Sequence, residues 1–323
     1  MDLEPKIFLI SFVVTVILGI FILPILQRLK VGQSEREDGP KSHLKKSGTP
    51  TMGGIIMAVS IFILCIVASI MKKGLALKIM GLYLCCLGFG LIGFIDDFKK
   101  VILRNTKGLK PRQKMLGLLI VSLVFVIFVL AIGEIGTEII VPFTKGTIHM
   151  PVIIFAIFTI FVLLATTNAI NLTDGIDGLA TTVSLIIVAT LTIIAIVNSV
   201  FEVALLGAIT CGSCVGFLLF NLNKAKVFMG DTGSLLLGGV IACMAIYLKM
   251  PLLIVIIALI PVIETLSVII QVAYFKKTHG KRIFKMAPIH HHFELSGWRE
   301  TKVVRVFSLT TLVLCIIGLL SVL

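Results

Sequence analysis

The sequence predicts an all-α integral membrane protein with ten transmembrane helices and both termini on the outer side of the membrane. Of its 323 residues, 58% are apolar, and the mean hydropathy is +1.14, well above that of soluble domains, which are roughly half apolar. The chain contains ten apolar stretches of roughly the length that a helix needs to cross a bilayer. Because lipid cannot satisfy free backbone N–H and C=O groups, stretches without strand-like alternation must be helices.

The ten stretches leave room for only short loops, so we expect a single membrane domain, 1–323. In order, they are 7–27, 52–70, 79–95, 116–132, 152–170, 179–197, 203–220, 234–248, 251–275 and 306–323. Glu264, shortly after Pro261 in the ninth stretch, is the one charged residue inside them. An acid inside a membrane helix is a candidate for function. A structural hydrogen bond across a proline kink explains it equally well.

The positive charge falls on one side of the predicted helices. Of the 29 Lys and Arg residues, 23 lie in the loops 28–51, 96–115, 171–178, 221–233 and 276–305. The positive-inside rule therefore makes these loops cytoplasmic. The net charge of +13 suits anionic lipid headgroups or an anionic soluble substrate. Nucleic-acid binding is not expected, because no soluble domain is present to carry it.

A polar run between the fifth and sixth stretches carries the strongest chemical pattern. Asn168, Asn171, Asp174 and Asp177 recur at every third residue, so successive members would share one face of a helix. Amide and carboxylate oxygens are ligands that suit Mg²⁺. Alternatively, an aspartate there accepts a hydrogen bond from a nucleobase or a ribose hydroxyl.

Paired aspartates, Asp96 and Asp97, follow the third stretch. Acids at a helix C-terminus oppose the helix dipole, which favours a functional role over a solvated helix end. Adjacent side chains on a helix point about 100° apart, so we expect one carboxylate to face a metal or phosphate while the other orients its neighbours. The glycines at 88, 90 and 93 formally match a dinucleotide-binding motif but lie inside a membrane helix, where they favour close packing.

Another polar segment, 228–234, follows the seventh stretch. Asp231 can bind a metal, Phe228 can stack on a flat base, and the glycines on either side let the backbone approach a ligand. Thr232 or Ser234 would cap the helix that follows. On the same side, Lys46 and Lys114 are candidate phosphate contacts, because each directly precedes a turn or helix and a lysine is a point charge suited to phosphate.

The last cytoplasmic loop ends in His290, His291 and His292, beside several lysines and an arginine. Three adjacent histidines cannot share one helix face, although alternate ones would share a side of an extended segment. Zinc is not expected without cysteines or spaced ligands. The imidazoles are therefore expected to donate hydrogen bonds to phosphate.

At these motifs, over essentially the whole chain, the sequence resembles the phospho-N-acetylmuramoyl-pentapeptide transferase family of the polyprenyl-phosphate N-acetylhexosamine-1-phosphate transferase superfamily. The matching runs are Gly48–Gly54, Asp96–Asp97, Asn171–Gly178, Gly230–Gly233 and Ala287–Glu294. The aspartate motifs are shared across the superfamily. The His-His-His-Phe-Glu run is more specific to the muramoyl-pentapeptide branch.

The resemblance implies transfer of phospho-MurNAc-pentapeptide from UDP-MurNAc-pentapeptide to undecaprenyl phosphate, giving lipid I and UMP at the cytoplasmic face of a bacterial plasma membrane. It implies Mg²⁺ dependence, a homodimer and ten helices. Carried over, it makes Asp231, with Asn171, the metal site and Asp97 the base for the lipid phosphate. Asp96 then positions phosphate or metal, and His290 is catalytic or binds phosphate. The residues that would surround the substrate are Lys46, Lys114, Asn171, Asp174, Asp177, Phe228, His291 and His292.

Two other functions remain open from the sequence. One is a sister transferase that uses UDP-GlcNAc as the donor. The other is a secondary transporter, for which intramembrane charges and inverted repeats are expected. The single buried glutamate and the absence of a detected repeat count against a transporter.

Overall fold

In the computed structural model the protein is an all-α bundle, which confirms the predicted fold class. The structure describes residues 3–28, 48–101, 108–144 and 146–322. Within these ranges, ten helices are long and apolar enough to cross a membrane, as the hydropathy pattern predicts. The long helices are α1 Leu3–Arg28, α3 Gly54–Met71, α4 Ala76–Val101, α5 Pro111–Phe128, α6 Val152–Thr173, α7 Leu179–Val197, α8 Phe201–Asn221, α9 Gly230–Tyr247, α11 Leu259–Lys277 and α13 Glu300–Leu320.

Short elements connect these helices. They are η1 Lys73–Leu75, η2 Val129–Gly133, η3 Pro251–Leu253, α10 Ile254–Ile257 and α12 Ile289–Leu295, with a two-stranded antiparallel sheet of β1 Glu138–Ile140 and β2 Thr147–His149. The hydropathy pattern did not predict this hairpin, because three-residue strands are too short to show alternation.

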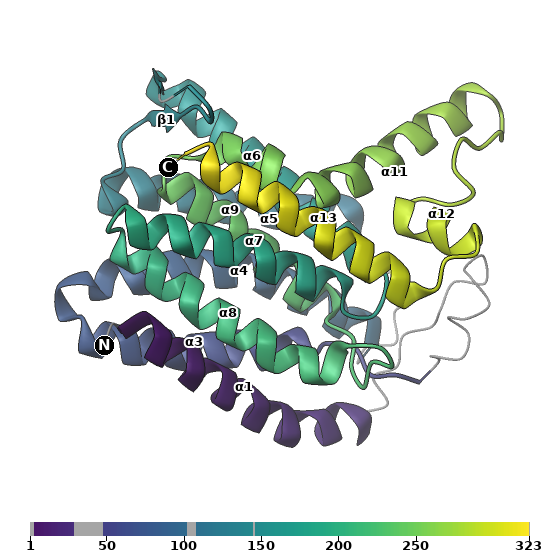
Figure 1. Ribbon diagram of the computed structural model, residues 1–323, viewed down its shortest axis with the longest axis horizontal. Coiled ribbons are helices and arrows are strands. Elements are labelled where there is room, and N and C mark those ends of the chain that lie inside the picture. The colour runs from purple at the N-terminus through teal and green to yellow at the C-terminus, as the bar shows by residue number, and fades with distance from the viewer. Residues whose placement is uncertain (1–2, 29–47, 102–107, 145, 323) are drawn as a thin grey trace.

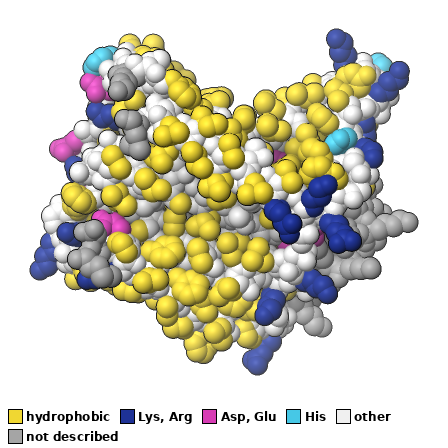
Figure 2. Space-filling model, in the orientation of Figure 1, with side chains coloured by type: hydrophobic (Ala, Val, Ile, Leu, Met, Phe, Trp, Pro, Cys, Tyr) yellow, Lys and Arg dark blue, Asp and Glu magenta, His cyan; other side chains and the backbone are white. Residues whose placement is uncertain are grey.

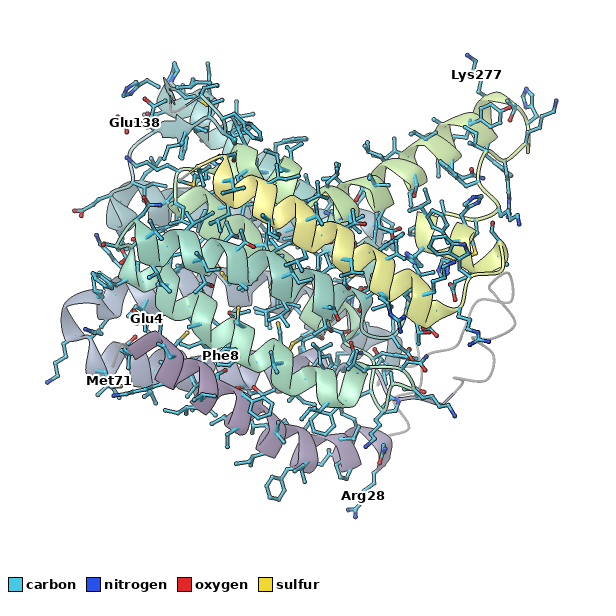
Figure 3. The ribbon with its side chains drawn as sticks, in the orientation of Figure 1. Glu4, Phe8, Arg28, Met71, Glu138 and Lys277 are labelled. Carbon is cyan, nitrogen blue, oxygen red and sulfur yellow. The ribbon has the colours of Figure 1, made fainter. Side chains whose placement is uncertain are left out.

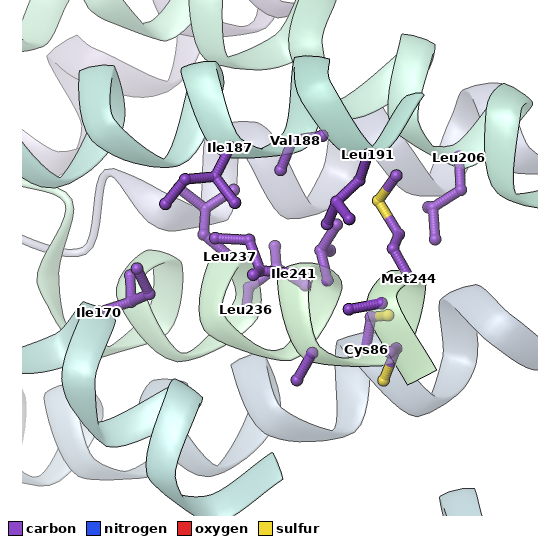
Figure 4. Packing of buried hydrophobic residues seen from close by; sticks show 14 of the residues in the cluster. Cys86, Ile170, Ile187, Val188, Leu191, Leu206, Leu236, Leu237, Ile241 and Met244 are labelled. Atoms are coloured by element: carbon purple, nitrogen blue, oxygen red, sulfur yellow. The ribbon is translucent and has the colours of Figure 1, made fainter. Parts of the chain in front are cut away.

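Helix α9 lies at the centre of the bundle and packs against α4, α6, α3 and α7. Its side chains interlock with Ile187 and Leu191 of α7 and with Cys86 of α4 (Figure 4). Its mean hydropathy is only 1.4, against 2.9 for the peripheral helix α1. A helix surrounded by other helices can carry Gly, Ser and Thr, whereas one that faces lipid needs apolar side chains.

Glycines allow α9 to approach its neighbours at the backbone level. A Cβ at Gly93 of α4 would overlap the carbonyl oxygen of Asp231, and one at Gly54 of α3 would overlap the backbone of Gly233. A Cβ at Gly90 would lie 3.1 Å from Leu236. The glycines of the third stretch therefore serve helix packing, as predicted, and not dinucleotide binding.

The two termini lie at one end of the bundle, as an even number of crossings requires (Figure 1). Arg28 and Lys277 lie at the other end, opposite Glu138 (Figure 3). On the face drawn in Figure 2, Lys and Arg side chains gather at this second end, and hydrophobic side chains cover the middle of the molecule. This second end is hereafter called the basic end.

The predicted ninth stretch, 251–275, is not one helix. It is interrupted at Ala258, between α10 and α11, and α11 leans away from the bundle (Figure 1). Pro261 explains the break, because it cannot donate a hydrogen bond to the carbonyl of Ile257 one turn earlier. The thiol of Cys315 on α13 lies 3.8 Å from that carbonyl and donates to it.

Candidate active site

Four helices bring their polar ends together at the basic end of the bundle. The site combines the C-terminal ends of α4 and α6 with the N-terminal ends of α5 and α9. Neighbouring helices run in opposite directions, so residues far apart in the sequence meet at the same depth. Asp96, Asp97, Lys114, Asn171 and Asp231, predicted from separate loops, are brought together in this way.

Asp231, in the first turn of α9, is the centre of this cluster. Its Oδ2 atom lies 3.0 Å from Lys100 Nζ and 2.9 Å from Lys114 Nζ. Its Oδ1 atom accepts a hydrogen bond of 2.9 Å from the amide of Asn171 on α6. The predicted residues Lys114, Asn171 and Asp231 are therefore in direct contact, and two ammonium groups face one oxygen of the Asp231 carboxylate.

Asp96 lies beside Asp231 and shares a lysine with it. Its Oδ2 atom lies 2.6 Å from Lys100 Nζ, and its Oδ1 atom accepts the Leu109 N–H at 2.6 Å. Lys100 is a site residue that the sequence analysis did not select. Its position four residues after Asp96 on the same helix was the available signal, because such pairs lie on one face.

Asp97 points away from Asp96, as the helix geometry predicts, and receives the N-terminus of α9. Its Oδ2 atom accepts the backbone N–H of Thr232 at 2.9 Å and the Thr232 hydroxyl at 2.7 Å. Its Oδ1 atom accepts the Asp231 N–H at 3.2 Å. Asp97 therefore caps α9 from another helix, which corrects the expectation that Thr232 or Ser234 is the N-cap.

The polar run 168–178 is only partly helical, contrary to the expectation of one shared face. Helix α6 ends at Thr173, so Asp174 and Asp177 lie in the loop that follows. Asp174 accepts a hydrogen bond from the Gly230 N–H, next to Asp231. Burial, together with the carboxylates of Asp231 and Asp97, raises the pKa of Asp174 to about 8.

Asp177 serves the loops around the site. Its side chain accepts the Ala225 N–H at 3.0 Å, and its own N–H donates to Glu300 Oε1 at 2.8 Å. Glu300, in the first turn of α13, was not selected from the sequence. The one available signal was that an acid is favoured near a helix N-terminus. These contacts tie the 174–178 loop to α13 and to the segment before α9.

Phe228 is held by its backbone. Its N–H donates to the Pro50 carbonyl at 2.8 Å, and its own carbonyl accepts the Gly53 N–H at 2.9 Å. The side chain is partly exposed. The backbone of Phe228 is thus fixed while the residue stays half-buried, which is compatible with stacking on a base.

The three histidines make different polar contacts, although the rings of His290 and His291 lie side by side with their centroids 4.1 Å apart. His290 is fully buried, and its Nδ1 atom lies 3.1 Å from Oε1 of the buried Glu264. His291 Nδ1 lies 2.9 Å from Glu294 Oε2. His292 Nδ1 accepts the Lys285 N–H at 3.1 Å. In the structure, then, His290 points into the bundle, whereas His291 and His292 contact their own segment.

Lys46, the remaining predicted phosphate contact, lies outside the residues that the structure describes. Among the described residues, no group of three His, Cys, Asp or Glu side chains is arranged to hold a metal ion. The oxygens at Asp231, Asp96 and Asn171 are nevertheless hard donors of the kind that Mg²⁺ prefers. In the structure these carboxylates are paired with Lys100 and Lys114.

Comparison with known proteins shows which family the chain belongs to. A model of glycosyl transferase family 4 matches residues 79–249. The chain is 50% identical over 313 residues to the phospho-N-acetylmuramoyl-pentapeptide-transferase of Clostridium kluyveri, covering 97% of both proteins. It is 48% identical over 320 residues to the protein of that name in Acetivibrio thermocellus, covering 97% of this chain and 93% of the relative. For that of Halalkalibacterium halodurans, identity is 48% over 304 residues, with coverages of 93% and 91%.

The ten-helix membrane fold and these matches define a membrane-bound transferase of glycosyl phosphates. The chain belongs to glycosyl transferase family 4 and, within it, to the phospho-N-acetylmuramoyl-pentapeptide-transferases. The secondary transporter that composition alone left open is thereby set aside.

Proposed function

We propose that the protein transfers phospho-MurNAc-pentapeptide from UDP-MurNAc-pentapeptide to undecaprenyl phosphate, with release of UMP and formation of lipid I. The observation that supports this proposal is the cluster in which Lys100 and Lys114 meet Asp231 at one end of an apolar bundle. Phosphoryl transfer depends mainly on positioning and on cations that offset the phosphate charge. An apolar bundle in the membrane suits a substrate with a polyprenyl tail.

In this reaction an oxygen of the lipid phosphate attacks the phosphorus next to the sugar, and the bond from that phosphorus to the UMP oxygen breaks. We propose that Lys114 and Lys100 contact the diphosphate oxygens. Phe228 would stack on the uracil. Asn171 and His290 would lie nearer the phosphates. The other proposed contacts of the donor are Asp174, Asp177, His291, His292 and Lys46.

Magnesium dependence is part of the proposal. Asp231, Asn171 and the neighbouring Asp96 are the residues that would hold the ion, and when bound it would neutralise charge on the diphosphate. In the structure the Asn171 amide N–H group donates to Asp231 and Ser234, so the amide would have to rotate for its oxygen to face a bound ion.

Asp97 fits a positioning role better than the expected role as base. Both of its oxygens accept hydrogen bonds from the first residues of α9. A base needs a free lone pair directed at its substrate. We therefore propose that Asp97 fixes Asp231 in place, and that Asp96, in contact with Asp231 and Lys100, is the carboxylate nearer the reacting phosphates.

The location of the site follows from charge. We propose that the basic end faces the cytoplasm of a bacterial cell and that both termini lie outside, because the positive-inside rule places loops rich in Lys and Arg there. We also propose that the chain forms a single domain over 1–323 and that it assembles as a homodimer. The mass of the purified protein in detergent tests the dimer.

The donor decides between this function and that of the sister transferase. We expect UMP release with undecaprenyl phosphate and Mg²⁺ to be strongly favoured with UDP-MurNAc-pentapeptide over UDP-GlcNAc. The muramoyl-pentapeptide carries further carboxylates, which the basic loop at Lys281, Arg282 and Lys285 can meet. Equal or better use of UDP-GlcNAc would assign the protein to the sister branch instead.

A further inference from the structure

Helix α11 carries a line of buried polar side chains through an otherwise apolar surface. Glu264, Ser267 and Gln271 are buried, and their spacing of three and four residues places them on one face of the helix. Exposed apolar residues such as Leu266, Ile269 and Ile270 cover other parts of it. A charged side chain in such a setting requires a partner.

This polar face of α11 holds the segment that carries the histidines. Gln271 Oε1 accepts the backbone N–H groups of Ile283 and Phe284 at 3.1 and 3.0 Å. Two turns earlier, Glu264 meets His290. Its Oε2 atom lies 3.4 Å from the His290 backbone N–H, and its Oε1 atom lies 3.1 Å from Nδ1.

Gln271 shows that a neutral amide is sufficient to hold backbone N–H groups of this segment. A buried carboxylate costs more desolvation than an amide unless it is well paired. Holding the backbone of the histidine segment therefore does not explain why residue 264 is charged. The Glu264 carboxylate also faces the imidazole of His290.

The other ring nitrogen of His290 is directed at the active-site loop. Within the described residues, neither ring nitrogen of His290 meets a partner in hydrogen-bond geometry, and Nε2 is buried. It faces the backbone at Gly175, where a Cβ would overlap it. Gly175 directly follows Asp174, whose carboxylate accepts the Gly230 N–H beside Asp231. The Nε2 atom of His290 thus points toward the loop that lines the site.

We propose that Glu264 is a positioning residue for His290. Its carboxylate holds Nδ1 as a protonated nitrogen, so that Nε2 stays directed at the 174–178 loop. There Nε2 accepts a hydrogen bond while the ring is neutral and donates one to the substrate when the ring is protonated. A carboxylate on one nitrogen of a histidine fixes the tautomer and the ring orientation. The 3.1 Å contact lies outside ideal hydrogen-bond angles, and such contacts tighten when substrate binds.

This inference rests on the proposed transferase activity, so the test measures UMP release and also a property that needs no turnover. Glu264→Ala should lower kcat about 10- to 100-fold, the usual effect of removing a residue that orients a ligand. The KM for UDP-MurNAc-pentapeptide should stay within about twofold, because the defect is in the orientation of a reacting group. Glu264→Gln, which keeps an acceptor near Nδ1, should recover part of the lost rate.

The decisive comparison is a double-mutant cycle with His290→Ala. If Glu264 acts through His290, then Glu264→Ala adds no further loss of kcat to a protein that already lacks the imidazole. Ser267→Ala is the matched control. Among the residues that the structure describes, the buried Ser267 hydroxyl donates to the Glu264 carbonyl on the same helix, so this substitution should leave kcat unchanged. The melting temperature of each variant shows whether it is folded.

Nitrogen-15 NMR of histidine-labelled protein provides the turnover-independent measurement. The His290 signal, identified by its loss in His290→Ala, should show a proton on Nδ1 in the wild type, and Glu264→Ala should remove that preference. The inference would be overturned if the losses of kcat in the two single variants multiply in the double variant. An unprotonated Nδ1 in the wild type would overturn it as well. Absence of UMP release from the wild type with a protonated Nδ1 would reject the proposed function and leave the Glu264–His290 pairing standing.

Discussion

Asp231 is the residue on which the proposed chemistry depends most, because two ammonium groups and one amide converge on its carboxylate. Its negative charge orders both lysines. Removing that charge would leave Lys100 with Asp96 alone and Lys114 with only a 3.4 Å contact to Asn171 Oδ1.

We predict that Asp231→Asn lowers Mg²⁺-supported UMP release by about 100-fold or more. That factor corresponds to about 2.7 kcal/mol of lost transition-state stabilisation. Glu138→Gln, which removes a carboxylate bound to Lys249 at the opposite end of the bundle, is the control and should keep normal turnover. Near-normal turnover in a folded Asp231→Asn protein would exclude Asp231 from the metal site.

Asp174 gives a pH-dependent prediction. Its pKa is raised from 3.8 to about 8 by burial and by the neighbouring carboxylates, so the folded protein retains a proton that the unfolded chain loses. The free energy of unfolding therefore falls as the pH rises from about 4 to about 8, and it changes no further above that range. Asp174→Asn should raise the melting temperature at pH 8 and make little difference at pH 4. Melting curves of both proteins across this range test the sign, and an equal difference at every pH would contradict it.

The N-terminus of α9 is fixed by its neighbour α4. Asp97 of α4 caps it, and Gly93, one turn earlier on α4, leaves room for the Asp231 carbonyl. Local propensity does not explain this arrangement, since α9 has no side-chain cap of its own. The position of Asp231 thus depends on how closely α4 and α9 pack.

We predict that Gly93→Ala strongly reduces UMP release and lowers the melting temperature, because the new methyl group would overlap backbone that has no room to move. Overpacking of this kind typically costs about 1–3 kcal/mol. Gly74→Ala is the matched control, since nothing lies within 4 Å of a Cβ at that position. Equal effects of the two substitutions would mean that the α4–α9 contact is not what holds the site.

The molecule as a whole is polarised along its helices. The candidate active site and the Lys and Arg side chains that gather on the face in Figure 2 lie at one end, and the β1–β2 hairpin and both termini lie at the other (Figures 1 and 2). Since Lys and Arg flanking membrane helices are retained in the cytoplasm, this polarity predicts the orientation in the membrane.

Cysteine labelling in intact cells tests that orientation. The seven native cysteines are buried, so their background reaction with a membrane-impermeant maleimide should be low. His149→Cys, in the exposed hairpin, should react from outside, whereas Lys281→Cys should react only after the cells are opened. The reverse pattern would place the site on the outer face, where UDP-linked donors are not expected.

The sequence alone determined the features that depend on local composition. Ten apolar stretches specified ten membrane helices, because a lipid environment imposes length and polarity on each helix separately. The order of the loops then placed Asp96, Lys114, Asn171 and Asp231 at one end of the bundle. Side-chain chemistry was enough to nominate those residues.

Only the tertiary structure decided which groups are partners. The sequence nominated both Glu264 and His290 but gave no reason to pair them, because they are 26 residues apart. Their contact is visible only in the structure, where α11 leans outward after the break near Pro261. The same holds for Asp97, whose role as the cap of α9 depends on a helix that begins 133 residues later. Hydropathy and spacing indicate whether a segment lies in lipid and which of its side chains require polar partners. Which residues become those partners is decided by how the helices pack against one another.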